Sequence, residues 1–166
     1  MGVSGTGKST VGALLAEDLG VPYADADDFH PPANIAKMSA GTPLEDADRW
    51  PWLDAIGAWA RDHSRPGRPG GVVSCSALRR AYRDRLRAAA PGLCFLHLTG
   101  ERELIAGRMA ARKGHFMTAR LLDSQLATLE PLQPDEPGTA LDIAPEPETI
   151  AARAADALRT ACARRS

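Results

Sequence analysis

Apolar and polar residues alternate along the chain with two periods, one typical of helices and one of short buried strands. In residues 7–19, Val11, Leu15 and Leu19 recur at helical spacing, and Gly20 ends the segment. The helical pattern returns in later segments, which we expect to form helices: 33–41, 46–63, 78–90, 101–112, 118–130 and 148–165.

Short apolar runs separate these helices and predict strands. They comprise residues 21–25, 72–75, 94–98 and 139–144. Strands that alternate with helices of about 10–15 residues are typical of a parallel sheet with helices on both faces. We therefore expect an α/β fold. Pro51 falls within the predicted helix 46–63, where it is compatible with the first turn only.

Length, charge and cysteine content exclude several classes of protein. With 166 residues, the chain is long enough for one domain, 1–166, that carries at most a small lid. Its net charge of −1 offers no basic surface for a nucleic acid or an anionic membrane. No apolar run approaches the roughly 20 residues that span a bilayer. The cysteines, Cys75, Cys94 and Cys162, lack metal-site spacing and suit free thiols in the cytoplasm. We expect a cytoplasmic protein that binds neither nucleic acid nor membrane.

The segment GVSGTGKS at residues 2–9 matches the phosphate-loop pattern G-x-x-x-x-G-K-[ST] in full. Its glycines let backbone N–H groups wrap around a phosphate, and the helix that begins at Gly7 adds the positive end of its dipole. Lys8 is expected to reach the β- and γ-phosphates of a nucleoside triphosphate, and the Ser9 hydroxyl to hold Mg²⁺. The residues expected to bind the nucleotide here are Gly2, Val3, Ser4, Gly5, Thr6, Gly7, Lys8, Ser9 and Thr10.

A phosphate loop of this kind follows a β-strand, and only Met1 precedes Gly2. We therefore expect the first strand of the fold to be missing from these residues. The functional polypeptide is expected to be longer by on the order of 5–10 residues, the usual length of a strand. An inactive product that lacks this strand is the alternative.

A group of polar residues, Asp25, Asp27, Asp28 and His30, comes at the end of the predicted strand 21–25. Ligands bind at the carboxyl ends of strands in open α/β sheets. Alternate residues of a strand share a face, so we expect Asp25 and Asp27 to point together at the phosphate loop. One carboxylate beside Mg²⁺ and another beside a substrate hydroxyl suit phosphoryl transfer to an alcohol. The alternative is an Asp-rich turn that only shapes the loop.

Four segments carry a family resemblance: GVSGTGKST, DADDFHPPANIAKMSAGTPLEDADRWPWL, CSALRRAYRDRLR and ARKGHF. In this order the chain resembles the bacterial-type gluconokinases, from Gly2 to about Leu129. These are small P-loop kinases related to shikimate kinase and the nucleoside monophosphate kinases. The resemblance implies a three-layer α/β fold with a five-stranded parallel sheet, a helical lid and, in many members, a homodimer. It also implies Mg²⁺-dependent transfer of the ATP γ-phosphoryl group to the 6-hydroxyl of D-gluconate.

The resemblance assigns roles to individual residues. Asp27 is expected to bind and deprotonate the attacking hydroxyl, and Asp25 to orient it or a water bound to Mg²⁺. His30 is expected to hydrogen-bond a hydroxyl of the sugar acid, or else to be structural. A gluconate carboxylate prefers a guanidinium partner. The cations expected near the acceptor are Lys37, Arg49, Arg79 and Arg83, the last two spaced i, i+4 and so expected on one helix face.

The segment ARKGHFM is expected to form a lid around residues 108–120. Arg112 is expected to be the main cation that closes over the triphosphate, with Arg108 also at the nucleotide and His115 at the substrate. Such a lid neutralises developing charge and excludes water, whose attack on ATP is the competing reaction.

Two other functions fit parts of the sequence. A shikimate-type kinase shares the Asp-x-Asp pattern and the phosphate loop, but it would carry Gly-Gly-Arg after the third strand. Here Gly70 and Gly71 precede the predicted strand 72–75, and Ser76-Ala-Leu78 follow it. A nucleotide-binding switch without phosphotransfer would need a switch threonine or a water-positioning glutamine, and the sequence indicates neither.

Overall fold

The computed structural model describes residues 1–111 and 119–163, in which helices alternate with strands. The strands are β1 (Tyr23–Asp25), β2 (Val72–Ser74), β3 (Phe95–Thr99) and β4 (Gly138–Asp142). The helices are α1 (Lys8–Leu19), α2 (Pro32–Ser39), α3 (Asp46–His63), α4 (Arg80–Ala89), α5 (Arg102–Ala111), α6 (Ala119–Thr128) and α7 (Pro147–Ala163). This order confirms the predicted alternation.

Local sequence accounts for most helix ends. Gly20 adopts a left-handed conformation, φ 65°, and its N–H closes the last turn of α1. At the start of α3, Glu45 and Asp48 form a reciprocal capping box. The expectation for Pro51 is wrong: it lies inside α3, past the first turn. A proline there removes one hydrogen bond to the carbonyl four residues earlier, and the box offsets part of that cost.

The strands form two parallel pairs rather than one continuous sheet. In the first, Tyr23 to Asp25 of β1 face Val72 to Ser74 of β2. In the second, β3 and β4 pair along their whole lengths. Residues at the start of the chain lie between the pairs: the N–H of Leu98 donates to the carbonyl of Met1 at 2.9 Å. The five-stranded sheet implied by the resemblance is therefore represented, within 1–111 and 119–163, by four strands and this short bridge.

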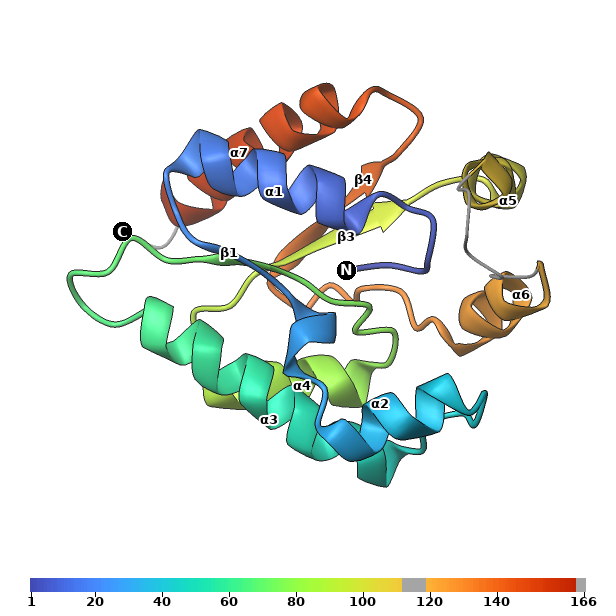
Figure 1. Cartoon of the computed structure of the whole chain (residues 1–166). Coiled ribbons are helices and arrows are strands. Elements are labelled where there is room, and N and C mark those ends of the chain that lie inside the picture. Colours follow the sequence, from blue (N-terminus) through green and yellow to red (C-terminus); the bar gives the residue numbers. More distant parts are fainter. Residues whose placement is uncertain (112–118, 164–166) are drawn as a thin grey trace.

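Helices cover both faces of the strands, as Figure 1 shows, with α1 and α7 on one side and α3 and α4 on the other. One apolar core lies beneath α1, α5 and α7 and includes Leu15, Ile105 and Ile150. A second lies beneath α3 and α4 and includes Leu53 and Ile56. The expected three-layer α/β architecture is confirmed. Among the described helices, none is long and apolar enough to cross a membrane.

Candidate active site

The phosphate loop occupies residues 2–7, between the chain start and α1. Gly2 is needed there because a Cβ would lie 2.6 Å from the carbonyl oxygen of Leu98. Gly7 caps α1 with φ 83°, a left-handed conformation that favours glycine. Inside the loop, the buried Thr6 hydroxyl donates to the carbonyl of Val3 at 2.9 Å. Val3 itself is buried in the core, so it offers a ligand only its backbone.

Two groups beside the loop are positioned by its geometry. The Lys8 ammonium lies 2.9 Å from the carbonyl oxygen of Val3, folded back over the loop. The Ser9 hydroxyl donates to Oδ2 of Asp25 at 2.8 Å, which joins the first turn of α1 to the end of β1. The nucleotide and metal residues predicted from the phosphate-loop motif therefore meet the acidic segment at the carboxyl end of the sheet.

Asp25 is an acceptor for several neighbours at once. Its Oδ1 receives the Asp27 N–H at 3.1 Å, and the Tyr23 hydroxyl lies 3.3 Å from its Oδ2. Burial alone would raise the pKa of Asp25, but the hydrogen bonds from Asp27, Ser9, Ser74 and Tyr23 outweigh it and hold that pKa below its usual range. Asp25 is therefore an ionised carboxylate at neutral pH.

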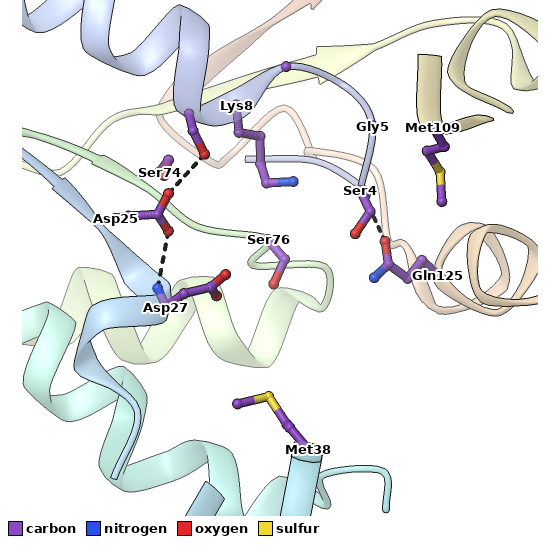
Figure 2. Close-up of a pocket in the computed structure, with 12 residues that line it drawn as sticks. Ser4, Gly5, Lys8, Asp25, Asp27, Met38, Ser74, Ser76, Met109 and Gln125 are labelled. Carbon is purple, nitrogen blue, oxygen red and sulfur yellow. Dashed lines mark hydrogen bonds between the residues drawn. The ribbon is translucent and has the colours of Figure 1, made fainter. Parts of the chain in front are cut away.

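Asp27 reaches the same site by a different local structure from the one predicted. The strand ends at Asp25, and Asp27 lies in a 3₁₀ helix, Ala26–Phe29, that Asp25 caps. The reason given for their shared direction, alternation along a strand, is therefore wrong, yet both carboxylates face the phosphate loop (Figure 2). Asp27 makes no side-chain hydrogen bond among those found in the described residues, and its carboxylate is exposed.

These side chains surround one open pocket of about 340 Å³, drawn in Figure 2. Its lining combines the loop, the acidic segment, the end of β2 and parts of α2, α5 and α6. The residues are Ser4, Gly5, Gly7, Lys8, Ser9, Asp25, Asp27, Met38, Ser74, Ser76, Met109 and Gln125. The volume falls in the range of small-molecule sites. Thr10, predicted at the nucleotide, is exposed on α1 and does not line the pocket.

Gln125 is a site residue that sequence reasoning missed. Its side-chain oxygen accepts the Ser4 N–H at 2.6 Å, although α6 is 121 residues further along the chain (Figure 2). A phosphate-loop amide is thus held by a neutral acceptor. Met38 and Met109, which also line the pocket, were missed as well. Periodicity shows only that such residues lie on helices, and no motif marks them.

The cations predicted for the acceptor are tied to carboxylates at the start of α3. Lys37 contacts Asp48 at 2.6 Å. Arg49 and Arg79 both contact Asp46, at 3.5 and 3.1 Å. The Tyr82 hydroxyl donates to the same carboxylate. This hydrogen bond is the main cause that holds the pKa of Asp46 below its usual range, and the charges of Arg79 and Arg49 lower it further. None of the three cations lines the pocket, so their role toward a substrate stays a prediction.

The prediction that Arg83 faces the acceptor is wrong. Its side chain has no exposure and is paired with the equally buried Glu136 at 2.6 Å. Arg83 also donates to the carbonyls of Ala77, Leu78 and Glu130. Arg79 precedes α4 as its exposed N-cap, so the two arginines do not share a helix face. Arg83 therefore links α4 to Glu136 inside the protein, and we call this buried Arg83–Glu136 pair the internal brace.

His30 and Arg108 hold structural contacts. The His30 ring stacks on Trp52 with centroids 4.6 Å apart, and its Nδ1 lies 3.3 Å from the Asn34 amide nitrogen. Burial lowers the pKa of His30, which keeps the ring neutral at pH 7. Arg108 donates to the carbonyl of Ile143 at 2.9 Å. The predicted lid residues Arg112 and His115 lie outside the described residues.

Comparison with known proteins agrees with this geometry. A family model described as shikimate kinase matches residues 4–126. A gluconokinase of Gluconobacter oxydans is 50% identical over 137 residues, which cover 82% of this chain and 76% of that protein. The thermosensitive gluconokinase of Escherichia coli is 46% identical over 136 residues, which cover 82% of this chain and 72% of that protein.

A solved structure extends the likeness to three dimensions. The crystal structure of a gluconokinase from Sinorhizobium meliloti superposes with a TM-score of 0.84 at 50% identity, covering 96% of this chain and 89% of that one. Identity at this level over most of both chains, together with a phosphate loop and paired carboxylates in one pocket, shows that this chain belongs to the gluconokinase family of shikimate-kinase-like P-loop kinases.

Proposed function

We propose that the chain is a gluconokinase, which transfers the γ-phosphoryl group of ATP to the 6-hydroxyl of D-gluconate. The observation that carries the proposal is the convergence of Lys8, Ser9, Asp25 and Asp27 on one pocket. The relatives at 42–50% identity are named gluconokinase or probable gluconokinase. Phosphate-binding groups without an acceptor carboxylate would fit a nucleotide switch equally well. The exposed Asp27 carboxylate favours a kinase instead.

The phosphate loop supplies charge stabilisation. Its backbone amides and the N-terminus of α1 would bind the β- and γ-phosphates, and Lys8 would move from the Val3 carbonyl to a phosphate oxygen. In phosphoryl transfer the protein contributes mainly by positioning and electrostatics. Each charge-assisted hydrogen bond contributes roughly 1.5–3 kcal/mol, so loss of Lys8 alone should be felt strongly.

The donor set fits Mg²⁺. Ser9 and Asp25 present a hydroxyl and an ionised carboxylate 2.8 Å apart, and Mg²⁺ prefers oxygen ligands. The described residues contain no cluster of three or more His, Cys, Asp or Glu that could hold a metal. That agrees with an ion held by one or two protein groups, with phosphates and water completing the shell. When bound, the ion would neutralise charge that develops on the transferred phosphoryl group.

Asp27 is the residue best placed to receive the acceptor. It lines the pocket across from Lys8, and its carboxylate is exposed to an incoming hydroxyl. We infer that Asp27 binds the 6-hydroxyl and accepts its proton. The Asp25 carboxylate accepts the backbone N–H of Asp27 and so fixes the position of Asp27. Lys37, Arg49 and Arg79 remain the predicted partners of the gluconate carboxylate. A homodimer and a cytoplasmic location also stay predictions.

A coupled ADP-release assay tests the activity. The chain would receive ATP and Mg²⁺ with gluconate, shikimate or nucleoside monophosphates in parallel, and a buffer blank. We expect ADP release that depends on gluconate. Equal release with and without acceptor, or a preference for shikimate, contradicts the proposal.

Asp27→Asn tests the assigned base. General-base catalysis contributes typically 10²–10⁴-fold, so kcat should fall by about that factor while ATP still binds. Asp28→Asn is the matched control, since Asp28 is exposed on the same 3₁₀ helix but does not line the pocket. Near-normal turnover of the Asp27 variant, or an equal loss in both variants, would remove Asp27 from this role.

A further inference from the structure

The chain leaves β2 through a turn, residues 76–78, whose backbone is strained. Ala77 has φ 43°, and it is the one residue other than glycine with a positive φ among residues 1–111 and 119–163. In this left-handed region the Cβ of an alanine comes too close to the following carbonyl oxygen, so the conformation costs free energy. Strain of this kind persists where the surrounding structure enforces it, and it concentrates at functional sites.

The three carbonyls of this turn all accept hydrogen bonds. The Ser76 carbonyl accepts the N–H of Gly2, in the phosphate loop, at 3.1 Å. The carbonyls of Ala77 and Leu78 accept hydrogen bonds from Nη1 of Arg83, at 3.2 and 3.3 Å. The internal brace thus holds the two residues that follow Ser76, and the phosphate loop holds Ser76 itself. These contacts fix the direction in which the Ser76 side chain leaves the backbone.

The Ser76 side chain projects from the turn into the pocket of the candidate active site (Figure 2). It is half-buried, and its hydroxyl has no hydrogen-bond partner in the described parts of the chain. Ser74, at the end of β2, differs in this respect, because its hydroxyl lies 2.9 Å from the Tyr23 hydroxyl. A half-buried hydroxyl without a protein partner, on a backbone that its surroundings hold under strain, is suited to bind a ligand.

Ser76 complements Asp27 in the chemistry that it offers to a ligand. Both residues line the pocket, and in Figure 2 both lie on the same side of Lys8. An ionised carboxylate only accepts hydrogen bonds, whereas a serine hydroxyl both donates and accepts them. Asp27 can therefore receive the hydroxyl that reacts while Ser76 binds a second hydroxyl. The phosphates have the loop amides and Lys8, so a neighbouring hydroxyl of the acceptor is the group that this arrangement fits.

We propose that the Ser76 hydroxyl is a second acceptor-binding group, which forms a hydrogen bond with the 5-hydroxyl of gluconate, next to the 6-hydroxyl that reacts. The strained turn at residues 76–78, held by Gly2 and Arg83, presents this hydroxyl. Ser76 thereby selects acceptors that end in two adjacent hydroxyls. The inference rests on the proposed function and adds to it a residue that determines specificity.

Steady-state kinetics of wild type and Ser76→Ala test the assignment, with gluconate and with its 5-deoxy analogue, which keeps the 6-hydroxyl. The analogue is measured as a substrate and as a competitor of gluconate. Ser39→Ala is the matched control, because Ser39 is exposed at the end of α2, does not line the pocket and has no side-chain hydrogen bond among the described residues. Thermal unfolding shows whether each variant is folded at the assay temperature.

We expect Ser76→Ala to lower kcat/KM for gluconate by about 3–10-fold, the effect of one neutral hydrogen bond, and to leave the KM for ATP unchanged. Wild type should use the 5-deoxy analogue less well than gluconate by at least that factor, and Ser76→Ala should not lower its use further. An equal loss with both acceptors, a raised KM for ATP, or a loss shared by Ser39→Ala overturns the assignment.

The wild-type measurement separates this inference from the proposed function. A wild type without gluconate-dependent ADP release contradicts both. A wild type that is active on gluconate, with a Ser76→Ala variant of equal kcat/KM, contradicts the role of Ser76 alone.

Discussion

Replacement of Arg83 by methionine removes the internal brace while keeping an unbranched side chain. Arg83 has no exposure, and its Nε and Nη2 donate to the two carboxylate oxygens of Glu136 at 2.6 and 2.9 Å. Its Nη1 also donates to the carbonyls of Ala77, Leu78 and Glu130. The substitution therefore leaves the buried Glu136 carboxylate with only the Gln133 N–H as donor, and it removes the Arg83 donor from several carbonyls.

The magnitude follows from the partner that is left behind. Breaking a buried pair by removing one member costs about 3–5 kcal/mol, because the remaining charge is uncompensated. In a domain of this size each kcal/mol lowers Tm by roughly 2–4 °C, so we expect a fall of about 6–20 °C. Replacing both Arg83 and Glu136 by apolar residues should cost less than Arg83→Met alone, since no charge is then stranded.

The assay is thermal unfolding followed by circular dichroism, with turnover measured at a temperature where every variant is folded. Arg85→Met is the matched control: Arg85 lies on the same helix and also forms a two-pronged pair, with Asp54, but on the surface. Surface pairs contribute little, so its Tm should stay close to wild type.

Two results would refute this reasoning. A Tm for Arg83→Met equal to that of the Arg85 variant would mean that the buried pair does not brace the fold. A wild-type Tm combined with a selective rise in the KM for gluconate would return Arg83 to the substrate site.

Other predictions concern the loop, the brace and a thiol. Lys8→Ala should lower kcat/KM for ATP by at least about tenfold, and a value near wild type contradicts its role. Gln125→Glu, nearly the same shape, places a negative charge beside the Ser4 amide and should raise the KM for ATP about tenfold or more; an unchanged KM refutes this. Arg83 holds the pKa of Glu136 below 4.5, so the stability that Glu136 contributes is present above that pH and lost as pH falls through the lower folded value. The difference in unfolding free energy between wild type and Glu136→Gln should therefore shrink in acid. Burial raises the pKa of Cys75 to about 11, so mass spectrometry should find it unlabelled by thiol reagents at neutral pH until the chain unfolds.

Local pattern was sufficient for the main helices and strands and for the two segments that line the pocket, the phosphate loop and the acidic segment. The phosphate loop and the acidic segment are each continuous in sequence, and the sheet brings Ser9 and Asp25 within 2.8 Å. The helix predicted at 46–63 is α3 to the residue. What such patterns cannot show is which distant residue meets which.

Arg83 illustrates that limit. Its helix carries several arginines, and periodicity does not distinguish the buried one from those at the surface. The deciding fact is Glu136, 53 residues later in a segment without regular structure, which turns an arginine into a core residue. Gln125 is a similar case, because its significance lies in one contact with Ser4 across 121 residues.

The phosphate loop depends on such distant contacts for its shape. Gly2 donates to Ser76 beyond β2, Leu98 of β3 donates to Met1, and Gln125 of α6 accepts from Ser4. Each contact anchors the loop to a different element, and none is encoded in the motif itself. A site preorganised in this way stabilises developing charge without paying for reorganisation during the reaction.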